Sequence, residues 1–321
     1  MSLFKPKSKS KSKSKAREEE HLSEHTRSEV TEILRRVRKI ELRTRGLVRE
    51  SFGGEYHSSF KGDGIDFEDF REYQPGDEVR SIDWDVTARM GHPFVKKFIE
   101  EREMTVFVCV DISASGNYGS HGPSKREMMA EVAALLTFSA LQNKDKVGLI
   151  LFTDEVELYL PPKKGTGHAL RIIREILLHE PKGHKTSLEE PIHILKNAVR
   201  RRSLVFLLSD FLFEEDLASD LRIVNRKHDL VAIQVSDPAE LAIPALGQVR
   251  LEDPETGQQV EINTSSPRVR AAYQNAAAEW QEEIEQQFKR LSIDMLSLRT
   301  DEEYVPALHG FFKRRTSAEH A

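Results

Sequence analysis

The stretch Met104-Thr-Val-Phe-Val-Cys-Val-Asp-Ile-Ser-Ala-Ser115 decides how this chain folds. Its first seven residues form an almost uninterrupted apolar run rich in β-branched side chains, which predicts a strand buried on both faces. The run ends in Asp111, Ser113 and Ser115, whose side-chain oxygens follow the strand at once. We therefore expect a central parallel strand with a polar loop at its carboxyl end.

Apolar runs alternate with amphipathic stretches along the rest of the chain. Strands are expected at residues 104–110, 147–152, 204–208, 230–235 and 295–298, and helices at 125–141, 169–178, 188–199, 217–225, 267–291 and 305–312. A hairpin is expected from strand-like residues 249–251 and 260–262 around a turn at 253–257. This alternation predicts an α/β fold class, with a doubly wound, mostly parallel, Rossmann-like sheet covered by helices on both faces.

The region before this domain has a different composition. Residues 5–15 alternate Lys and Ser, which predicts a disordered tail because so polar a segment cannot bury apolar surface. From Ser28 apolar residues recur at helical spacing opposite a basic face, which predicts a helix docked by one side. Between Phe52 and Ile99, glycine pairs and Pro75-Gly76-Asp77 predict turns within a small β-rich module.

These patterns divide the chain into a tail (1–23), an N-terminal helix with the β-rich module (24–103), the α/β domain (104–300), and a C-terminal helix and tail (301–321). The single cysteine, Cys109, lies inside the buried strand, so no intrachain disulfide can form and a reducing compartment is expected. No apolar run reaches membrane-spanning length, and a net charge of -5 gives no reason to expect a nucleic acid. We expect a cytoplasmic protein without a membrane span or a specific nucleic-acid partner.

A second aspartate, Asp210, also follows a predicted strand. Ligands of open α/β sheets bind beyond the carboxyl ends of the strands, and a carboxylate there is costly to desolvate unless a cation or several donors meet it. Oxygen ligands without nearby Cys or His select a hard cation such as Mg²⁺ or Ca²⁺ over Zn²⁺. The alternative interpretation is local, with Ser113 and Ser115 capping the following loop and helix, and Asp210 capping a helix.

The pattern Asp111-x-Ser113-x-Ser115, with Thr186 between two predicted helices and Asp210 after a strand, resembles the metal-ion-dependent adhesion site of von Willebrand factor A domains. In such domains the serines and the threonine bind the ion directly or through water, and the aspartates often act through water or serine hydroxyls. One coordination position stays open for a carboxylate of a partner protein. The resemblance thus implies a von Willebrand factor A-like fold, a Mg²⁺ cofactor with Mn²⁺ or Ca²⁺ as alternatives, and a partner with an acidic side chain.

A second resemblance lies in the N-terminal module, which contains Phe60-x-Gly62-x-Gly64-x-x-Phe67-x-x-x-Arg71-x-Tyr73-x-x-Gly76-Asp77-x-x-Arg80-x-Ile82-Asp83-Trp84-x-x-x-Ala88-Arg89. This run resembles the signature of domain-of-unknown-function family 58, bacterial proteins with such a module ahead of a von Willebrand factor A-like domain. The chain resembles the shorter members, which lack membrane helices. The family's common association with MoxR-type AAA+ ATPases implies a chaperone-like or adaptor partnership.

The charged and aromatic signature residues allow two interpretations. They could form an internal salt-bridge network, with Trp84 anchoring the module to the α/β domain, or they could form a partner-binding surface. The residues concerned are Arg71, Tyr73, Gly76, Asp77, Arg80, Asp83, Trp84 and Arg89.

Enzymatic functions find less support in the sequence. There is no G-x-x-x-x-G-K-[ST] phosphate loop and no G-x-S-x-G elbow, so nucleotide hydrolysis and serine hydrolase chemistry are not expected. The alternative function is magnesium-dependent phosphoryl transfer with Asp111 as nucleophile. That chemistry usually needs a second acid where this chain has Ser113, and a phosphate-binding cation, for which Lys185 is the candidate. A structural scaffold with an empty site is a third hypothesis. We favour a non-enzymatic interaction module working with a MoxR-type ATPase in protein assembly or maturation.

Overall fold

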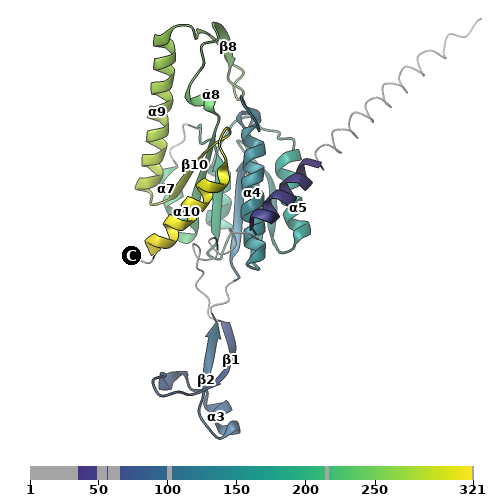
Figure 1. Cartoon of the computed structure of the whole chain (residues 1–321), viewed down its shortest axis with the longest axis vertical. Helices are drawn as coiled ribbons and strands as arrows, with labels where there is room; N and C mark the ends of the chain where they lie inside the picture. The colour runs from purple at the N-terminus through teal and green to yellow at the C-terminus, as the bar shows by residue number, and fades with distance from the viewer. Residues whose placement is uncertain (1–34, 49–55, 57–65, 100–102, 214–216, 320–321) are drawn as a thin grey trace, which may run out of the picture.

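The computed structural model describes residues 35–48, 56, 66–99, 103–213 and 217–319 (Figure 1). The predicted Lys/Ser tail lies outside these residues, as does the beginning of the helix predicted from Ser28.

Six strands form the central sheet, and all but one run parallel to their neighbours. In sheet order they are β10 (Asp294–Arg299), β7 (Asp229–Ser236), β6 (Leu204–Ser209), β3 (Thr105–Asp111), β4 (Lys146–Phe152) and β5 (Val156–Lys163). The strand β3, which comes first in the chain, lies in the middle of the sheet. The chain then adds β4 and β5 on one side of β3, and afterwards β6, β7 and β10 on the other side. The predicted doubly wound α/β fold is confirmed, and the winding reverses between β3 and β6.

The strand β5 was not predicted from the sequence. It pairs antiparallel with β4 at the edge of the sheet, and only Leu160 along its length is fully buried. Its Pro161 and Pro162 mask the strand pattern, yet an edge strand accommodates prolines because one side needs no ladder hydrogen bonds. The sheet therefore gains one antiparallel edge strand over the prediction.

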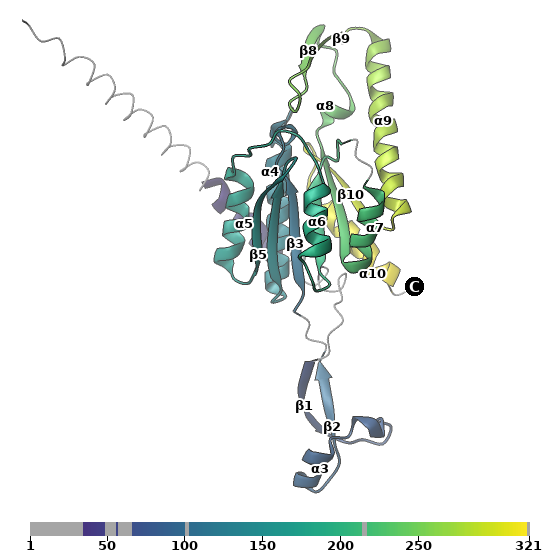
Figure 2. The same ribbon diagram turned by 180° about the vertical axis from the view of Figure 1, so that it is seen from behind.

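Two layers of helices cover the sheet (Figures 1 and 2). One layer contains α4 (Lys125–Gln142), α5 (Thr166–Leu178) and α10 (Tyr304–Glu319), and the other contains α6 (Glu189–Asn197), α7 (Ala218–Lys227) and α9 (Pro267–Arg290). Alternate residues of β3 enter two separate cores: Val106, Val108 and Val110 face the first layer, while Phe107 and Cys109 face the second. Burial on both faces explains why the strand is apolar throughout.

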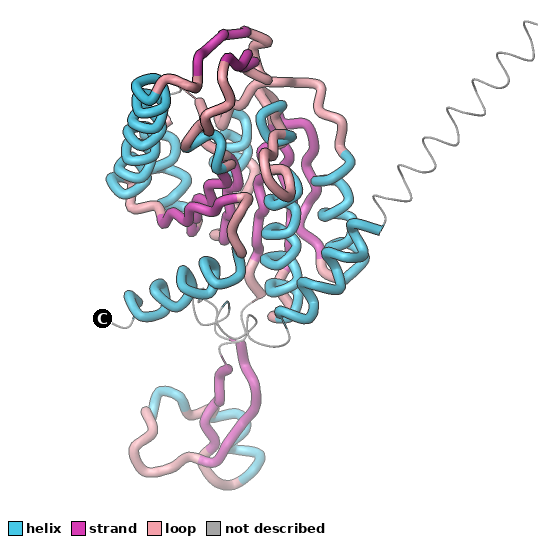
Figure 3. The backbone as a smooth tube through the Cα atoms, turned by 45° about the horizontal axis from the view of Figure 1, so that its top comes forward, coloured by secondary structure: helices cyan, strands magenta, loops and turns pink. Residues whose placement is uncertain are grey.

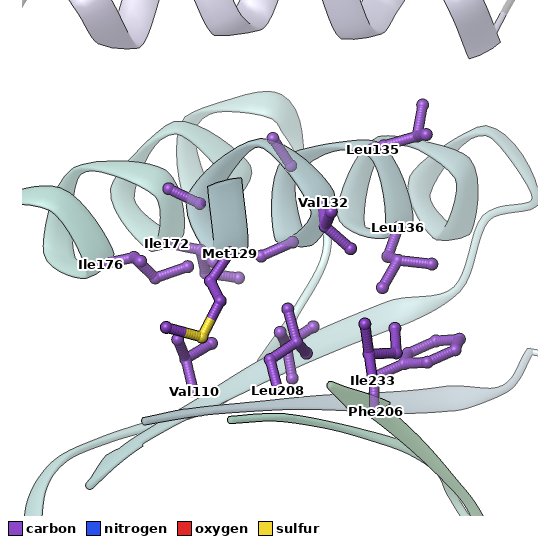
Figure 4. Close-up of a cluster of buried hydrophobic side chains, with 14 of the residues drawn as sticks. Val110, Met129, Val132, Leu135, Leu136, Ile172, Ile176, Phe206, Leu208 and Ile233 are labelled. Carbon is purple, nitrogen blue, oxygen red and sulfur yellow. The ribbon is translucent and has the colours of Figure 1, made fainter. Parts of the chain in front are cut away.

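The first core lies between the sheet and α4, where Met129 reaches toward Val110 (Figure 4). Residues 35–47 are helical and add Val37 and Ile40 to this core. The basic face of this helix pairs with α4, for example through Arg43 and Glu131. The described part of the predicted N-terminal helix thus docks by its apolar stripe.

The N-terminal module is a hairpin with a helix at its far end. Strands β1 (Asp66–Glu72) and β2 (Phe94–Ile99) pair antiparallel, and the short η2 (Val79–Ser81) and α3 (Trp84–Met90) lie between them in the chain. The helix α3 forms because Asp83 accepts the backbone N–H groups of Asp85 and Val86 as an N-cap. In Figures 1 and 2 this module projects from the end of the sheet opposite the carboxyl ends of the parallel strands.

The interpretation of the signature residues as an internal charge network, with Trp84 as an anchor, is met only in part. Trp84 is 65% exposed, so it does not anchor the module to the α/β domain. Of the expected charge network only the pair of Arg71 and Asp77 forms between the described side chains, with both oxygens of Asp77 accepting at 2.7 Å. Arg80 and Arg89 point into solvent instead and make no ion pair with a described side chain.

A second hairpin lies at the carboxyl end of the sheet. It consists of β8 (Gln248–Glu252) and β9 (Gln259–Asn263), preceded by the single turn α8 (Pro238–Leu241). Figure 3 shows it at the top of the molecule, away from the N-terminal hairpin. The hairpin predicted around residues 253–257 therefore forms. Across the described ranges, no helix is both long and apolar enough to cross a membrane.

Asp145 gives the fold a testable pH dependence. Burial raises the pKa of this carboxyl to about 7, and although its Oδ1 accepts the Met104 N–H at 2.9 Å, Oδ2 has no hydrogen-bond partner among the described residues. The folded chain binds this proton more tightly than the unfolded chain, so the stability contributed by Asp145 falls as the pH rises from about 4 to 7. We expect Asp145→Asn to gain stability over wild type between pH 5 and 8, by up to about 3 kcal/mol, in urea unfolding. Identical pH dependence in the two proteins would contradict this assignment.

Candidate metal centre

The reversal of winding between β3 and β6 places two aspartates at one edge of the sheet. These strands are hydrogen-bonded neighbours in parallel register, with Val110 opposite Leu208. Asp111 ends β3, and Asp210 directly follows β6. Because the carboxyl ends of parallel strands meet at the same edge, the fold brings together two residues that are 99 positions apart in the chain.

The five residues predicted as a site lie in one hydrogen-bonded network. Ser113 Oγ and Ser115 Oγ are 3.0 Å apart, and Ser115 Oγ donates to Asp210 Oδ2 at 2.8 Å. Asp111 Oδ1 accepts the Ser113 N–H at 2.9 Å, and Thr186 Oγ1 lies 3.3 Å from Asp111 Oδ2. All five are at most 7% exposed. The structure therefore assembles every predicted site residue in one buried cluster.

The serines do not serve as helix caps. Ser113 precedes η3 (Ala114–Asn117), but its side chain makes no capping hydrogen bond there. Asp210 accepts the Leu212 N–H at 3.2 Å, yet the next helix, α7, begins only at Ala218. The local interpretation of these residues as caps is therefore wrong, because their hydroxyl and carboxylate groups turn toward one another.

The loop that carries Thr186 is held in place by Glu157 of β5. This carboxylate accepts the backbone N–H groups of Lys182 and Gly183 at 2.7 and 2.9 Å, and the Thr153 hydroxyl at 3.1 Å. Burial alone would raise the pKa of Glu157, but these donors outweigh it and lower the pKa. Gly183 favours glycine, since a Cβ there would come within 2.4 Å of Oγ1 and 3.0 Å of Cβ of the buried Thr153. The unpredicted strand β5 is thus part of what positions Thr186.

Three further residues of the centre were not predicted from the sequence. Ser209 donates to Asp111 Oδ2 at 2.6 Å, and its place directly before Asp210 was the only available signal. Lys125, at the start of α4, is completely buried and donates to Asp210 Oδ2 at 2.7 Å and to Glu240 of α8. Glu255, from the turn between β8 and β9, accepts from Thr186 Oγ1 at 2.8 Å. Lys125 and Glu255 come from distant elements, so no local pattern marks them.

The charges of the centre are not balanced. Burial, together with the neighbouring charge of Asp210, raises the pKa of Asp111 to about 7. Burial opposes the charge of Lys125, but Asp210 and Glu240 outweigh it and raise the pKa of this ammonium. Lys125 is shared between two carboxylates, and within the described residues no cationic side chain contacts Asp111. The site is therefore rich in oxygen donors and poor in positive charge.

This set of donors suits a hard divalent cation. Three hydroxyl oxygens and two carboxylates are gathered in a small volume, and Mg²⁺, Mn²⁺ and Ca²⁺ prefer such oxygen ligands. The described residues contain no cluster of three or more His, Cys, Asp or Glu that could hold a metal. The residues that could bind an ion here are instead mostly hydroxyl-bearing, namely Ser113, Ser115 and Thr186 beside Asp111 and Asp210.

The chain is similar to one protein family, to several curated proteins and to several solved structures. The family model described as "Protein of unknown function DUF58" matches residues 69–283. An uncharacterized protein of Mycobacterium bovis is 30% identical over 281 residues, covering 87% of this chain and 88% of that protein, and one of Mycobacterium tuberculosis matches equally. One solved structure that matches is the conserved hypothetical protein BatB from Bacteroides thetaiotaomicron, with 16% identity and a TM-score of 0.42, covering 67% of this chain and 99% of that chain. Another is the SpRpn10 VWA domain, with 12% identity and a TM-score of 0.35, covering 64% of this chain and 94% of that chain.

The doubly wound sheet and its buried cluster at the switch of winding define an α/β protein of the von Willebrand factor A-like class. The chain belongs to the DUF58 family, since the family model covers most of the described chain, including the signature residues from Arg71 to Arg89. The resemblance to family 58 is thereby confirmed, and the resemblance of the site to a metal-ion-dependent adhesion site stays a prediction.

Proposed function

We propose that this protein is a non-enzymatic protein-interaction module that binds an acidic side chain of a partner through a divalent metal at the centre described above. The metal is Mg²⁺, with Mn²⁺ and Ca²⁺ as alternatives. The von Willebrand factor A-like fold supports the coarser part of this proposal, a role in protein–protein interaction. The finer part, a metal-dependent contact, is supported by the chemistry of the cluster.

The imbalance of charge at the centre is the observation that carries this proposal. Asp111 and Asp210 are both buried, and Lys125, whose ammonium contacts Asp210, is shared with Glu240, while no cationic side chain among the described residues contacts Asp111. Buried carboxylates are costly unless cations or several donors satisfy them. A divalent ion bound by Asp111 and the hydroxyls of Ser113, Ser115 and Thr186 would supply the missing charge. Such an ion would also attract the carboxylate of a partner.

The partner class follows from the family resemblance. DUF58 proteins are associated with MoxR-type AAA+ ATPases, and this chain has no phosphate loop of its own. We propose that a MoxR-type ATPase or its client supplies the acidic side chain, in protein assembly or maturation. Cycles of nucleotide hydrolysis would then be performed by the partner, while this chain provides the contact.

The test combines metal titration with partner capture. Mg²⁺ and Mn²⁺ are titrated calorimetrically into the wild type and Ser113→Ala, and capture of a purified MoxR-type ATPase is measured with and without chelator. We expect metal binding and capture in the wild type, loss of both in Ser113→Ala, and release by chelator. Ser317→Ala, which removes an exposed hydroxyl on α10, is the matched control and should behave as wild type.

Two other outcomes would reject the proposal. Magnesium-dependent phosphate release from p-nitrophenyl phosphate, abolished by Asp111→Asn, would favour the phosphoryl-transfer alternative. Capture that is indifferent to chelator and to Ser113→Ala would favour a scaffold that makes its contacts elsewhere.

A further inference from the structure

The β8–β9 hairpin reaches the candidate metal centre through one carboxylate. Its residues are largely exposed, including Leu251 and Val260, which are 39% and 57% exposed. Glu255 at the tip is partly buried and accepts the Thr186 hydroxyl at 2.8 Å. A segment that is mostly in solvent thus inserts one acidic side chain into the site.

The tip of the hairpin is built to present this side chain. Asp253 Oδ1 accepts the Glu255 N–H at 2.9 Å, and Asp253 Oδ2 accepts the Thr256 hydroxyl. The turn closes with the Gly257 N–H donating to the Asp253 carbonyl at 2.8 Å, at a φ of 70° that favours glycine. These bonds fix the backbone around Glu255, so the turn determines the direction in which the Glu255 side chain leaves the hairpin.

Hydrogen bonds also hold the base of the hairpin in place. Thr264 is completely buried, and its hydroxyl donates to the Gly247 carbonyl and accepts the Leu246 N–H, both at 2.9 Å. Arg270 of α9 donates to the Thr264 carbonyl at 2.6 Å. The two strands therefore leave the domain from a fixed point, and the described contact of the hairpin with the centre is the bond between Glu255 and Thr186.

Glu255 occupies an electrostatically unfavourable place in the absence of a cation. Thr186 Oγ1 lies 2.8 Å from Glu255 Oε1 and 3.3 Å from Asp111 Oδ2, so two carboxylates meet at one hydroxyl. A carboxylate that shares a hydroxyl with a buried aspartate gains from this position only if positive charge joins them. The same position, next to a candidate ligand hydroxyl, suits an acid that completes the coordination of a metal ion.

We propose that Glu255 is the chain's own acidic ligand for the centre, occupying the place that a partner's carboxylate must take. This rests on the proposed function, because it assigns the occupant of the same metal site. In the closed state the hairpin covers the metal with Glu255, and a partner binds only by displacing it. A partner's carboxylate therefore competes with Glu255 for the metal. Only a partner whose acidic side chain is better placed, or present at higher local concentration, displaces the hairpin.

The experiment uses Mn²⁺ alone and acetate as probes on the full chain. The variants are Glu255→Ala and, as a matched control, Glu252→Ala, which removes an exposed carboxylate from the same hairpin. Water-proton relaxation reports how many water molecules bound Mn²⁺ carries, acetate titration reports access to its open position, and amide hydrogen exchange reports on residues 248–263.

Three results are expected. Mn²⁺ bound to Glu255→Ala carries one more water molecule than Mn²⁺ bound to the wild type or the control. Acetate binds the Mn²⁺-loaded Glu255→Ala chain about tenfold more tightly than the loaded wild type, because no internal acid competes. Mn²⁺ slows amide exchange in the hairpin of the wild type and of Glu252→Ala, but leaves exchange unchanged in Glu255→Ala.

Failure of the two proposals can be told apart. Equal hydration, acetate affinity and hairpin exchange in all three Mn²⁺-loaded proteins would overturn the role of Glu255 and leave the metal site standing. Absence of Mn²⁺ binding in the wild type and in both variants would overturn the metal site, and the role of Glu255 with it.

Discussion

Replacing Asp111 with alanine is expected to lower the affinity for Mg²⁺ and Mn²⁺ by at least about 100-fold. Asp111 is the carboxylate around which the centre is organised, since its oxygens accept from the Ser113 N–H and the Ser209 hydroxyl and lie 3.3 Å from Thr186 Oγ1. Its loss removes both a negative charge and the group that orients the hydroxyls. Calorimetric titration of the two metals measures the effect.

A second variant separates metal binding from folding. Asp111→Asn keeps the size of the side chain and one acceptor oxygen, so it should unfold at nearly the wild-type temperature while still binding metal weakly. Asp154→Ala removes an exposed carboxylate that follows β4 at the same edge of the sheet and should retain wild-type affinity. Wild-type metal affinity in both Asp111 variants would show that the centre does not bind the ion.

Replacing Lys125 with methionine is expected to lower the free energy of unfolding by about 3–5 kcal/mol without metal. The ammonium is wholly buried and bonds Asp210 Oδ2 at 2.7 Å as well as Glu240, so its removal leaves a buried carboxylate without its cation. Urea denaturation measures the loss. The control is Lys196→Met, which breaks the partly exposed pair with Asp220 and should cost less than about 1 kcal/mol.

Metal should partly reverse the loss in Lys125→Met. A divalent ion supplies the positive charge that the lysine provided, so saturating Mg²⁺ should stabilise the variant more than it stabilises the wild type. At 100 times the dissociation constant, binding contributes about 2.7 kcal/mol to the folded state. A loss no larger than that of Lys196→Met, or equal stabilisation of variant and wild type by Mg²⁺, would refute this interpretation of Lys125.

The predicted fold followed from local patterns that tertiary structure did not override. The apolar run ending in Asp111 became β3, and the alternation after it gave the other parallel strands and their helices close to the predicted bounds. The edge strand β5 escaped prediction because one face of it is exposed and two prolines interrupt it. The helix α3 was not predicted because the sequence around it is rich in turn residues, and the N-cap Asp83 nevertheless allows a helix to form.

Some residues of the candidate centre could likewise be predicted from local sequence, and others could not. Asp111, Ser113, Ser115 and Asp210 could be predicted because each stands directly at the end of a strand, where position in the sequence fixes position at the sheet edge. Thr186 could be predicted only through resemblance, since its place depends on a loop held by Glu157.

The sequence by itself thus determined the α/β class, the buried central strand and the carboxylates at its edge, because hydrophobic periodicity and strand ends are local properties. Only the tertiary structure decided that Lys125 would neutralise Asp210 and that Glu255 would meet Thr186. Lys125 lies at a helix start and Glu255 at a hairpin tip, and their partners are 85 and 69 residues away in the chain. Contacts of this kind depend on how separate elements pack, because residues so far apart meet only when the whole sheet is assembled.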